Sequence, residues 1–457
     1  MSIPSATAEE AGTIPSATYA AVAERFGTPT HVLDLARIER NYRNLRGAFD
    51  AAGLRMDVLY SVKTNYMPIV LGQLKALGAG MDVVSGFELD LALRLGFDGA
   101  AIVFNGPHKT DAEIERAMEA GVTINLDAPA EAMRVNAVAR RLGRRVPVGL
   151  RVNPGIGIYL SADPSYNAQA AQAARESKFG LSLADGAAAA AAELIASCEH
   201  LSLVGLHCHV GSQITDEAAL ASAIDAVLAF GASLRPRHPI AVVNIGGGFG
   251  VPGIRRTRRG LLGQMLALHG SDALDGQKDG FDLALFARAL RDAVGRHGLE
   301  DIRLCCEPGR AIVSDAMTLL SRVSSVKRSG GLDWVIVDAG LNLMPTIAMN
   351  EEHAIRSLVP DGGAMKPFRV AGPMCYEADI LGASRMLPEA TAEGDLVLIE
   401  DSGAYTVSRS TNFIRPRAPV VAIGNGGMEL CWRREEFDDI FAFHTPTSFF
   451  PEALHGR

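Results

Sequence analysis

A lysine that follows a short apolar run is the residue around which the chemistry of this chain can be organised. Lys63 comes just after the run 56–61 and is followed by polar residues. Lysine is seldom buried without a partner, so an isolated lysine at such a place is usually on the surface. At the end of a buried strand it can instead form an imine with a carbonyl compound, because partial burial lowers the pKa of an amine. The polar residues found elsewhere in the chain decide between these outcomes.

Eight short apolar runs alternate with stretches of helical spacing. The runs are 56–61, 80–85, 101–105, 122–126, 146–152, 203–209, 241–245 and 302–306. Strands that alternate with helices indicate a parallel sheet. Eight such units favour a closed (β/α)8 barrel of the TIM type over an open, doubly wound sheet.

Polar residues and glycines stand where these runs end. They are Lys63, Asp82, Ser85, Asn105, Arg151, His207, His209, Gly211, Ser212, 246–248, Glu307 and 308–310. Because the C-terminal ends of barrel strands meet at one face, we expect these residues to converge there. Two long connections, 153–178 and 251–281, leave the same face, where long loops are usually functional. The sequence assigns no role to the second connection.

The glycine turns and the charges beside them predict the class of ligand. Glycines at 246–250 let backbone N–H groups approach an anion such as a phosphate, and the guanidinium of Arg310 matches the same group. The third glycine of a dinucleotide site is replaced by Val251. A phosphate would repel Glu307 unless a cation such as a protonated pyridine ring lay between them, and His209 could stack on that ring. Together with an imine-forming lysine, this set predicts pyridoxal phosphate.

The sequence pattern changes after Arg310. Short β-rich segments with turn signals replace the helical units, which predicts a second, mainly antiparallel β domain. We therefore expect a barrel domain over residues 36–310 and a β-sandwich or β-barrel domain over 311–457. A strand within 19–35 precedes the barrel and could pair into the second domain.

Seven motifs carry a resemblance to a known family. They are S-V-K-T-N at 61–65, D-V-V-S-G at 82–86, H-C-H-V-G-S-Q at 207–213, G-G-G-F-G at 246–250, E-P-G-R at 307–310, G-P-M-C at 372–375 and G-A-Y at 403–405. In content and order they resemble the fold-type III pyridoxal phosphate decarboxylases, the group of the diaminopimelate, ornithine and arginine decarboxylases. The resemblance implies decarboxylation of an amino acid.

The resemblance also implies a role for each matching residue near the cofactor. Lys63 would hold the cofactor as an imine, His209 would stack on its ring, and Glu307 would pair with the ring nitrogen. The phosphate would be held by Ser212, Gly246, Gly247, Gly248, Gly309, Arg310 and Tyr405. The lysine and the ring would be supported by Asp82, Glu88 and Arg151.

The G-P-M-C motif at 372–375 supplies a further candidate residue, Cys375. Cys375 would belong to the second subunit of a homodimer with shared active sites. By the resemblance, its thiol would reprotonate the carbanion left after loss of carbon dioxide.

The sequence departs from the diaminopimelate branch at the positions that would contact the distal end of the substrate. The resemblance implies a glutamate just after the cysteine, and then an arginine and a tyrosine after the strand at 335–338. Here Tyr376 follows the cysteine and the acid moves to Glu377. No arginine or tyrosine occurs between residues 339 and 355, and Met344 stands near the expected arginine.

Acidic residues occur near the positions that would contact the distal end of the substrate, which favours a substrate with a distal ammonium. The candidate substrate contacts are Tyr376, Glu377, Asp379 and Glu351. The predicted substrate is ornithine or lysine, of L or D configuration, which would place the enzyme in polyamine metabolism. Diaminopimelate or a specialised secondary metabolite is the alternative. An amino-acid racemase and a non-catalytic regulator are alternatives of another class, and the cysteine motif and the set of site residues favour the decarboxylase over both.

The composition of the chain limits the binding partners and the cellular compartment that are expected. The net charge is −8 and the one basic run that stands out, 255–259, is short, so nucleic acid is not expected as a partner. No apolar run of membrane-spanning length or leader pattern stands out, which predicts a cytoplasmic protein without a membrane partner. Six cysteines in 457 residues show neither a disulfide framework nor zinc-ligand spacing, so no metal is expected.

Overall fold

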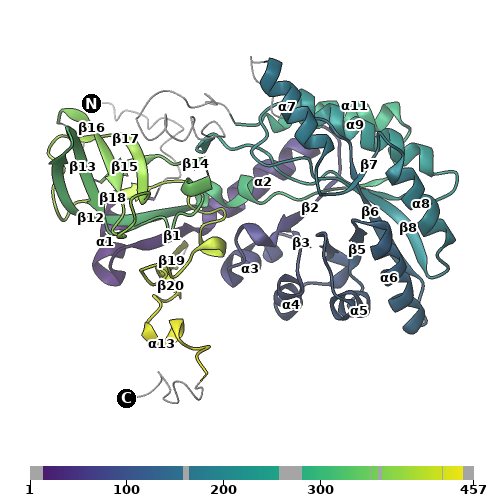
Figure 1. The fold of residues 1–457 in the computed structure, drawn as a ribbon, viewed down its shortest axis with the longest axis horizontal. Coiled ribbons are helices and arrows are strands. Elements are labelled where there is room, and N and C mark those ends of the chain that lie inside the picture. Colours follow the sequence, from purple (N-terminus) through teal and green to yellow (C-terminus); the bar gives the residue numbers. More distant parts are fainter. Residues whose placement is uncertain are drawn as a thin grey trace, which may run out of the picture. The chain divides into compact units, whose positions relative to one another are not determined.

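The computed structural model describes residues 14–157, 164–256, 280–349, 351–358, 363–424 and 426–445. The chain forms two compact units. The barrel unit contains residues 38–252 and 280–312, and the β unit contains 14–37, 253–256 and the described residues from 313 onward. Most of the elements of both units are labelled in Figure 1.

The barrel unit is a closed ring of eight parallel strands. They are β2 (Met56–Ser61), β3 (Gly80–Val83), β4 (Ile102–Phe104), β5 (Thr123–Leu126), β6 (Val146–Asn153), β8 (Leu201–His207), β9 (Val242–Asn244) and β11 (Arg303–Cys306). They pair in the order β5-β4-β3-β2-β11-β9-β8-β6, and a pairing of β5 with β6 closes the ring. All eight predicted strands are confirmed, and closure excludes the open sheet. A short strand, β7 (Leu181–Ser182), extends beside the end of β6.

Helices cover the outside of the ring and begin where the sequence supplies caps. α4 (Gly86–Arg94) starts after the N-cap Ser85, and α5 (Asp111–Glu119) starts after a capping box of Thr110 and Glu113. The other helices named along the barrel sequence are α2 (Leu35–Ala51), α3 (Pro68–Ala76), α6 (Pro129–Arg141), α7 (Pro164–Arg175), α8 (Ala187–Ser197), α9 (Glu217–Leu234), α11 (Leu283–Arg296) and α12 (Arg310–Val313).

Among the described residues, α9 is the one helix with the length and mean hydropathy of a membrane span. Sequence reasoning did not single out this run. Its buried residues recur at helical spacing and are Leu220, Ala223, Ile224, Val227, Leu228, Gly231 and Leu234. The helix packs against β8 and α11. A buried stripe of this kind is typical of a core helix in a folded domain.

The β unit is built around one mainly antiparallel sheet. Its path is β17-β16-β13-β12-β1-β19-β20, and β18 joins β12 to β15. The strands are β1 (Thr30–Asp34), β12 (Met317–Ser329), β13 (Leu332–Val337), β15 (Ile355–Ser357), β16 (Met365–Ala371), β17 (Ile380–Pro388), β18 (Leu396–Ile399), β19 (Val420–Gly424) and β20 (Gly427–Trp432). The predicted fold class, a (β/α)8 barrel with a C-terminal antiparallel β domain, is confirmed.

The N-terminal segment contains the strand that was predicted within 19–35. This strand is β1, and it pairs antiparallel with β12 and parallel with β19 of the β unit. α1 (Ser16–Phe26) takes the earlier residues, because Tyr19, Val22 and Ala23 have the spacing of one buried helical face.

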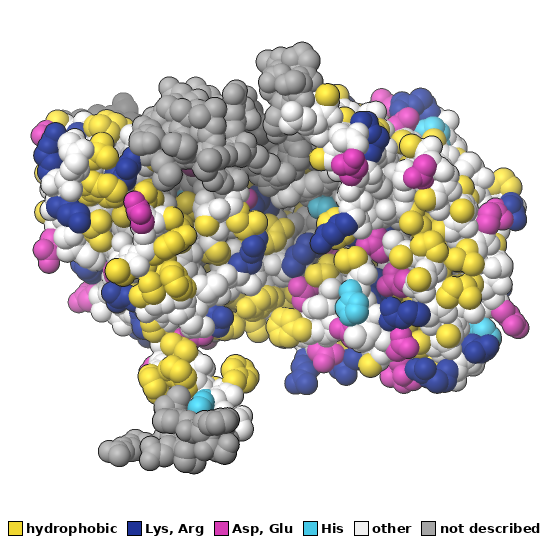
Figure 2. Space-filling view, viewed as in Figure 1, with side chains coloured by type: hydrophobic (Ala, Val, Ile, Leu, Met, Phe, Trp, Pro, Cys, Tyr) yellow, Lys and Arg dark blue, Asp and Glu magenta, His cyan; other side chains and the backbone are white. Residues whose placement is uncertain are grey.

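Two smaller features complete the described chain. β10 (Arg255–Arg256) pairs with β14 (Glu351–Glu352) within the β unit, and α13 (Phe437–Ile440) follows β20. Most of the connection 251–281 lies outside the described residues. On the face shown in Figure 2, basic and acidic side chains are interspersed over the barrel unit.

Candidate active site

The predicted lysine lies against a buried carboxylate at the barrel mouth. Lys63 is in a short turn after β2, with its side chain 38% exposed, and its Nζ is 2.8 Å from Oδ2 of Asp82. Ser61 donates its hydroxyl to the same oxygen at 2.8 Å. Burial opposes ionisation of Asp82, but the charge of Lys63 together with hydrogen bonds from Lys63, Asn105 and Ser61 outweighs it, so the pKa of Asp82 is lowered. The lysine therefore has a fixed counter-ion next to the site.

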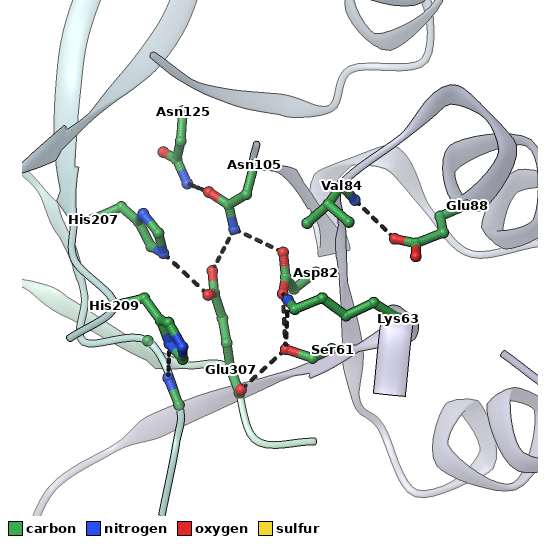
Figure 3. A network of polar contacts seen from close by, with 12 residues as sticks. Ser61, Lys63, Asp82, Val84, Glu88, Asn105, Asn125, His207, His209 and Glu307 are labelled. Carbon is green, nitrogen blue, oxygen red and sulfur yellow. Dashed lines mark hydrogen bonds and ion pairs between the residues drawn. The ribbon is translucent and has the colours of Figure 1, made fainter. Parts of the chain in front are cut away.

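Glu307 lies deeper in the barrel and accepts several hydrogen bonds (Figure 3). Its Oε1 accepts from the amide nitrogens of Asn105 and Asn244, both at 2.7 Å, and its Oε2 lies 3.0 Å from Nε2 of His207. Asn105 also donates to Oδ1 of Asp82 at 2.7 Å. Sequence reasoning noted Asn105 and His207 at strand ends without giving them a role, and it missed Asn244 altogether.

His209 is a neutral ring in this site. Its Nδ1 accepts the backbone N–H of Gly247 at 3.2 Å, so the ring proton is on Nε2. Burial and the nearby charge of Lys63 lower the pKa of His209 far below its usual range. An uncharged, oriented imidazole is suited to stacking on a flat ligand ring.

The glycine turn after β9 admits no side chain. A Cβ at Gly247 would lie 2.0 Å from the carbonyl oxygen of Glu307, and one at Gly248 would lie 2.1 Å from that of Gly211. Gly248 also has φ of 92°, which favours glycine. The turn therefore holds backbone close to the site, as a phosphate cradle requires. The predicted phosphate residues Ser212, Gly246, Gly309 and Arg310 lie at the same strand ends of the barrel unit, whereas Tyr405 belongs to the β unit.

Arg151 and Glu88 lie beside this centre. The guanidinium of Arg151 is 3.8 Å from Oδ2 of Asp127 and lies over the ring of Phe179, 4.5 Å from its centroid. Glu88 accepts the backbone N–H of Val84 at 2.8 Å. Burial, with a smaller contribution from the charge of Asp82, raises the pKa of Glu88 to about 7.

This shift leads to a testable pH effect for Glu88→Gln. The folded-state pKa of Glu88 is above its ordinary value of 4.5, so the folded protein binds more protons than the unfolded chain between pH 4.5 and 7. The wild type therefore loses stability as pH rises through this window, by up to about 3 kcal/mol, and the variant does not. We expect the melting temperature of Glu88→Gln, relative to wild type, to rise between pH 5 and pH 8.

Glu113→Gln is the matched control for this measurement. Glu113 accepts the backbone N–H of Gly86 at 2.7 Å, and hydrogen bonds of this kind lower its pKa despite partial burial. The Glu113 carboxyl is ionised in both the folded and the unfolded state across pH 5 to 8. The difference in melting temperature between Glu113→Gln and wild type should therefore stay constant over this range. If the difference in melting temperature between Glu88→Gln and wild type is equally constant, the prediction is contradicted.

The predicted substrate contacts all lie in the β unit. Residues 375–378 are exposed, and Tyr376 packs edge-on against Phe413 with ring centroids 5.8 Å apart. Glu377 is exposed, whereas Glu351 is buried on β14. Cys375 is an exposed free thiol.

Asp379 differs from the expectation for a substrate contact. It is 2% exposed, and its two carboxylate oxygens accept the backbone N–H groups of Leu341 and Met374 at 2.7 and 2.9 Å. Burial raises the pKa of Asp379, and these two hydrogen bonds partly offset that effect. A carboxylate engaged in this way ties the loop before Met344 to the loop before Cys375, which argues against the predicted contact with substrate.

The barrel residues fit pyridoxal phosphate. Lys63 would supply an amine for the aldehyde carbon, His209 a neutral ring for the pyridine face, Glu307 an acceptor for the ring nitrogen, and Gly247 with its neighbours a cradle for the phosphate. When bound, the cofactor supplies the electron sink that stabilises a carbanion at the substrate α-carbon. The chain's own tasks are to orient that carbon, exclude water and deliver a proton to it.

Comparisons with known proteins agree with this chemistry. A family model described as "Pyridoxal-dependent decarboxylase, pyridoxal binding domain" matches residues 35–314. A diaminopimelate decarboxylase of Pseudomonas aeruginosa is 34% identical over 431 residues, covering 92% of this chain and 94% of the relative. The relative of the same name from Methanocaldococcus jannaschii is 32% identical, covering 92% of each chain.

Solved structures are similar over the same length. The crystal structure of diaminopimelate decarboxylase from M. jannaschii in complex with L-lysine has a TM-score of 0.83 at 30% identity, covering 94% of this chain and 95% of that one. A diaminopimelate decarboxylase from Helicobacter pylori, also complexed with L-lysine, has a TM-score of 0.78 at 26% identity, covering 93% and 98%. The chain thus belongs to the pyridoxal-dependent decarboxylase family and is a pyridoxal-phosphate-dependent amino-acid decarboxylase.

Proposed function

We propose that this enzyme removes one carboxylate from a diamino acid, and that meso-diaminopimelate is its substrate. The observation that supports this proposal is the extent of the likeness to proteins named diaminopimelate decarboxylase, which spans more than nine tenths of the chain at up to 34% identity. Similar solved structures hold L-lysine, the compound that remains when diaminopimelate loses one carboxylate.

A second candidate is ornithine or lysine, of either configuration. It is favoured by Met344, which is fully buried in the apolar core of the β unit where the resemblance implies an arginine. A distal carboxylate that is buried without a cationic partner costs several kcal/mol even after relaxation, on the order of 3 to 5. The exposed Glu377 could instead contact a distal ammonium.

A panel of substrates separates the two candidates. We expect carbon dioxide release from meso-diaminopimelate to exceed release from L- and D-ornithine, L- and D-lysine and arginine. Sites that leave buried polar groups unpaired reject the wrong analogue by about 10⁴-fold, so the ranking should be unambiguous. The reverse ranking, with diaminopimelate inert, would replace the first candidate with the second.

Glu377→Gln adds an independent readout to the panel. If ornithine or lysine is the substrate, neutralising this acid should raise KM at least about tenfold, because a charge-assisted hydrogen bond to the ammonium is lost. If diaminopimelate is the substrate through other contacts, KM should change little. Glu389→Gln, another acid of the β unit that lies outside the substrate-contact set, is the control.

We also propose that the working enzyme is a cytoplasmic homodimer with shared active sites. Large apolar side chains are exposed beside Cys375: Tyr376, Phe413 and Ile414 each have about half of their surface accessible. Exposed aromatic clusters of this kind mark interfaces more often than solvated surface. In the dimer, the partner subunit would cover this cluster, and Cys375 of one subunit would reach the barrel of the other.

A further inference from the structure

The Glu307 carboxylate is surrounded by donors from three strand ends, and two of these donors, Asn105 and His207, are labelled in Figure 3. Asn105 follows β4, while Asn244 and His207 are the last residues of β9 and β8. The two amides both bond Oε1, and the imidazole bonds Oε2. All four side chains are buried, with at most 4% of the surface of any of these residues accessible. Glu307 itself accepts no other side-chain hydrogen bond at its carboxylate from the described residues.

The Asn105 amide can satisfy its neighbours in only one orientation. Its carbonyl oxygen accepts from the amide nitrogen of Asn125 at 2.8 Å, so its own nitrogen faces the two carboxylates. That nitrogen has two hydrogens, and it gives one to Glu307 and one to Asp82, each at 2.7 Å. Asn105 therefore joins the counter-ion of Lys63 to Glu307 through a single group, and an aspartate at position 105 could not do so.

The His207 ring is also restricted to one role. Its Nδ1 is buried and has no hydrogen-bond partner in the described part of the chain. A proton on Nδ1 would be left without an acceptor, which carries a desolvation cost. Nε2 therefore carries a proton, and His207 donates it to the Glu307 carboxylate.

We propose that His207, Asn105 and Asn244 are positioning residues that hold Glu307 where it meets the ring nitrogen of the bound cofactor. A carboxylate has about four acceptor sites, and these donors take three of them. The fourth, on Oε2, is left for one further N–H. Because the side chain is already ordered, Glu307 loses little freedom when the cofactor binds, so the contact with the ring nitrogen contributes more to affinity.

Two cofactors measure this contribution directly. The first is pyridoxal phosphate, and the second is its 1-deaza analogue, in which a C–H replaces the ring nitrogen. Attachment to Lys63 and binding of the phosphate are common to both, so the ratio of their dissociation constants isolates the contact with Glu307. For the wild type we expect the analogue to bind about 10- to 100-fold more weakly, the effect of one hydrogen bond to a charged group.

His207→Phe keeps an aromatic ring and removes the donor. In this variant we expect the ratio of the two dissociation constants to fall to about threefold or less. Without the His207 donor, the Glu307 carboxylate is no longer ordered before the cofactor binds, so its contact with the ring nitrogen contributes less to affinity. His207→Gln, which keeps an N–H donor, should restore most of the wild-type ratio. Cofactor affinity is read by fluorescence quenching during titration of the cofactor-free full-length chain, so the result does not depend on which amino acid is the substrate.

His238→Phe is the matched control. His238 is also a buried barrel histidine with a ring nitrogen that lacks a partner in the described part of the chain, but it precedes β9 and so lies at the opposite end of the barrel. Its variant should keep the wild-type ratio. Equal weakening of both cofactors by His207→Phe would indicate a purely structural role and overturn the proposal. If His207→Phe does not fold, Asn105→Leu provides the same measurement, and an unchanged ratio there overturns the proposal as well.

Discussion

Replacement of Lys63 by alanine is expected to abolish covalent cofactor attachment and to lower the decarboxylation rate by on the order of 10⁴-fold or more, the effect usually seen when a covalent catalytic residue is removed. The structure supports this expectation because the amine of Lys63 stands 2.8 Å from Asp82, at the mouth where Glu307 and His209 also lie. The variant should lack the visible absorbance band of the attached cofactor. In the wild type, reduction with borohydride should fix the cofactor to Lys63, as read by peptide mapping.

Two other lysines of the barrel unit provide the control. Lys75 is exposed and donates to the carbonyl oxygen of Leu95, so Lys75→Ala should keep both the absorbance and the activity. Lys109 is fully buried and bonds Glu131 at 2.9 Å, so it should not be labelled. Recovery of the reduced cofactor on any lysine other than Lys63 would disprove the assignment.

Cys375→Ala is expected to lower turnover by about 10²- to 10⁴-fold, the range for loss of a general acid. If the thiol acts in the partner's site, two inactive variants should complement each other. Random reassembly of equimolar Lys63→Ala and Cys375→Ala chains makes half of the dimers hybrid, and each hybrid has one intact site of two. About a quarter of the wild-type activity should therefore return.

The complementation experiment has a matched control variant and an outcome that would contradict the shared site. Cys431, a half-buried free thiol on β20, should tolerate alanine with near wild-type activity, and its mixture with Lys63→Ala should gain nothing beyond the sum of its parts. Subunit exchange is verified by native mass spectrometry of differently tagged chains. A mixture that exchanges fully and stays inactive would show that each site is made by one chain.

Much of the barrel could be predicted because its signals are local. Parallel strands that helices cover read as continuous apolar runs, so all eight strands could be located to within a few residues. A polar residue at the end of such a run is pointed at the catalytic face by the topology alone. The place of Lys63, Asp82, His209 and Glu307 at that face could therefore be predicted, whereas their roles toward the cofactor were implied by the family resemblance.

The rest was decided by contacts that no local pattern encodes. Asn105, His207 and Asn244 meet at Glu307 across 202, 100 and 63 residues of sequence, and amide and imidazole side chains at strand ends have many possible partners. Asp379 was predicted to contact the substrate, yet it accepts two backbone N–H groups that are 38 and 5 residues away. The sequence by itself thus determined which charged groups reach the barrel mouth, because strand direction follows from periodicity. Only the tertiary structure decided which donors each carboxylate accepts, because hydrogen-bond partners depend on distances of a few tenths of an ångström between strands that are remote in the chain.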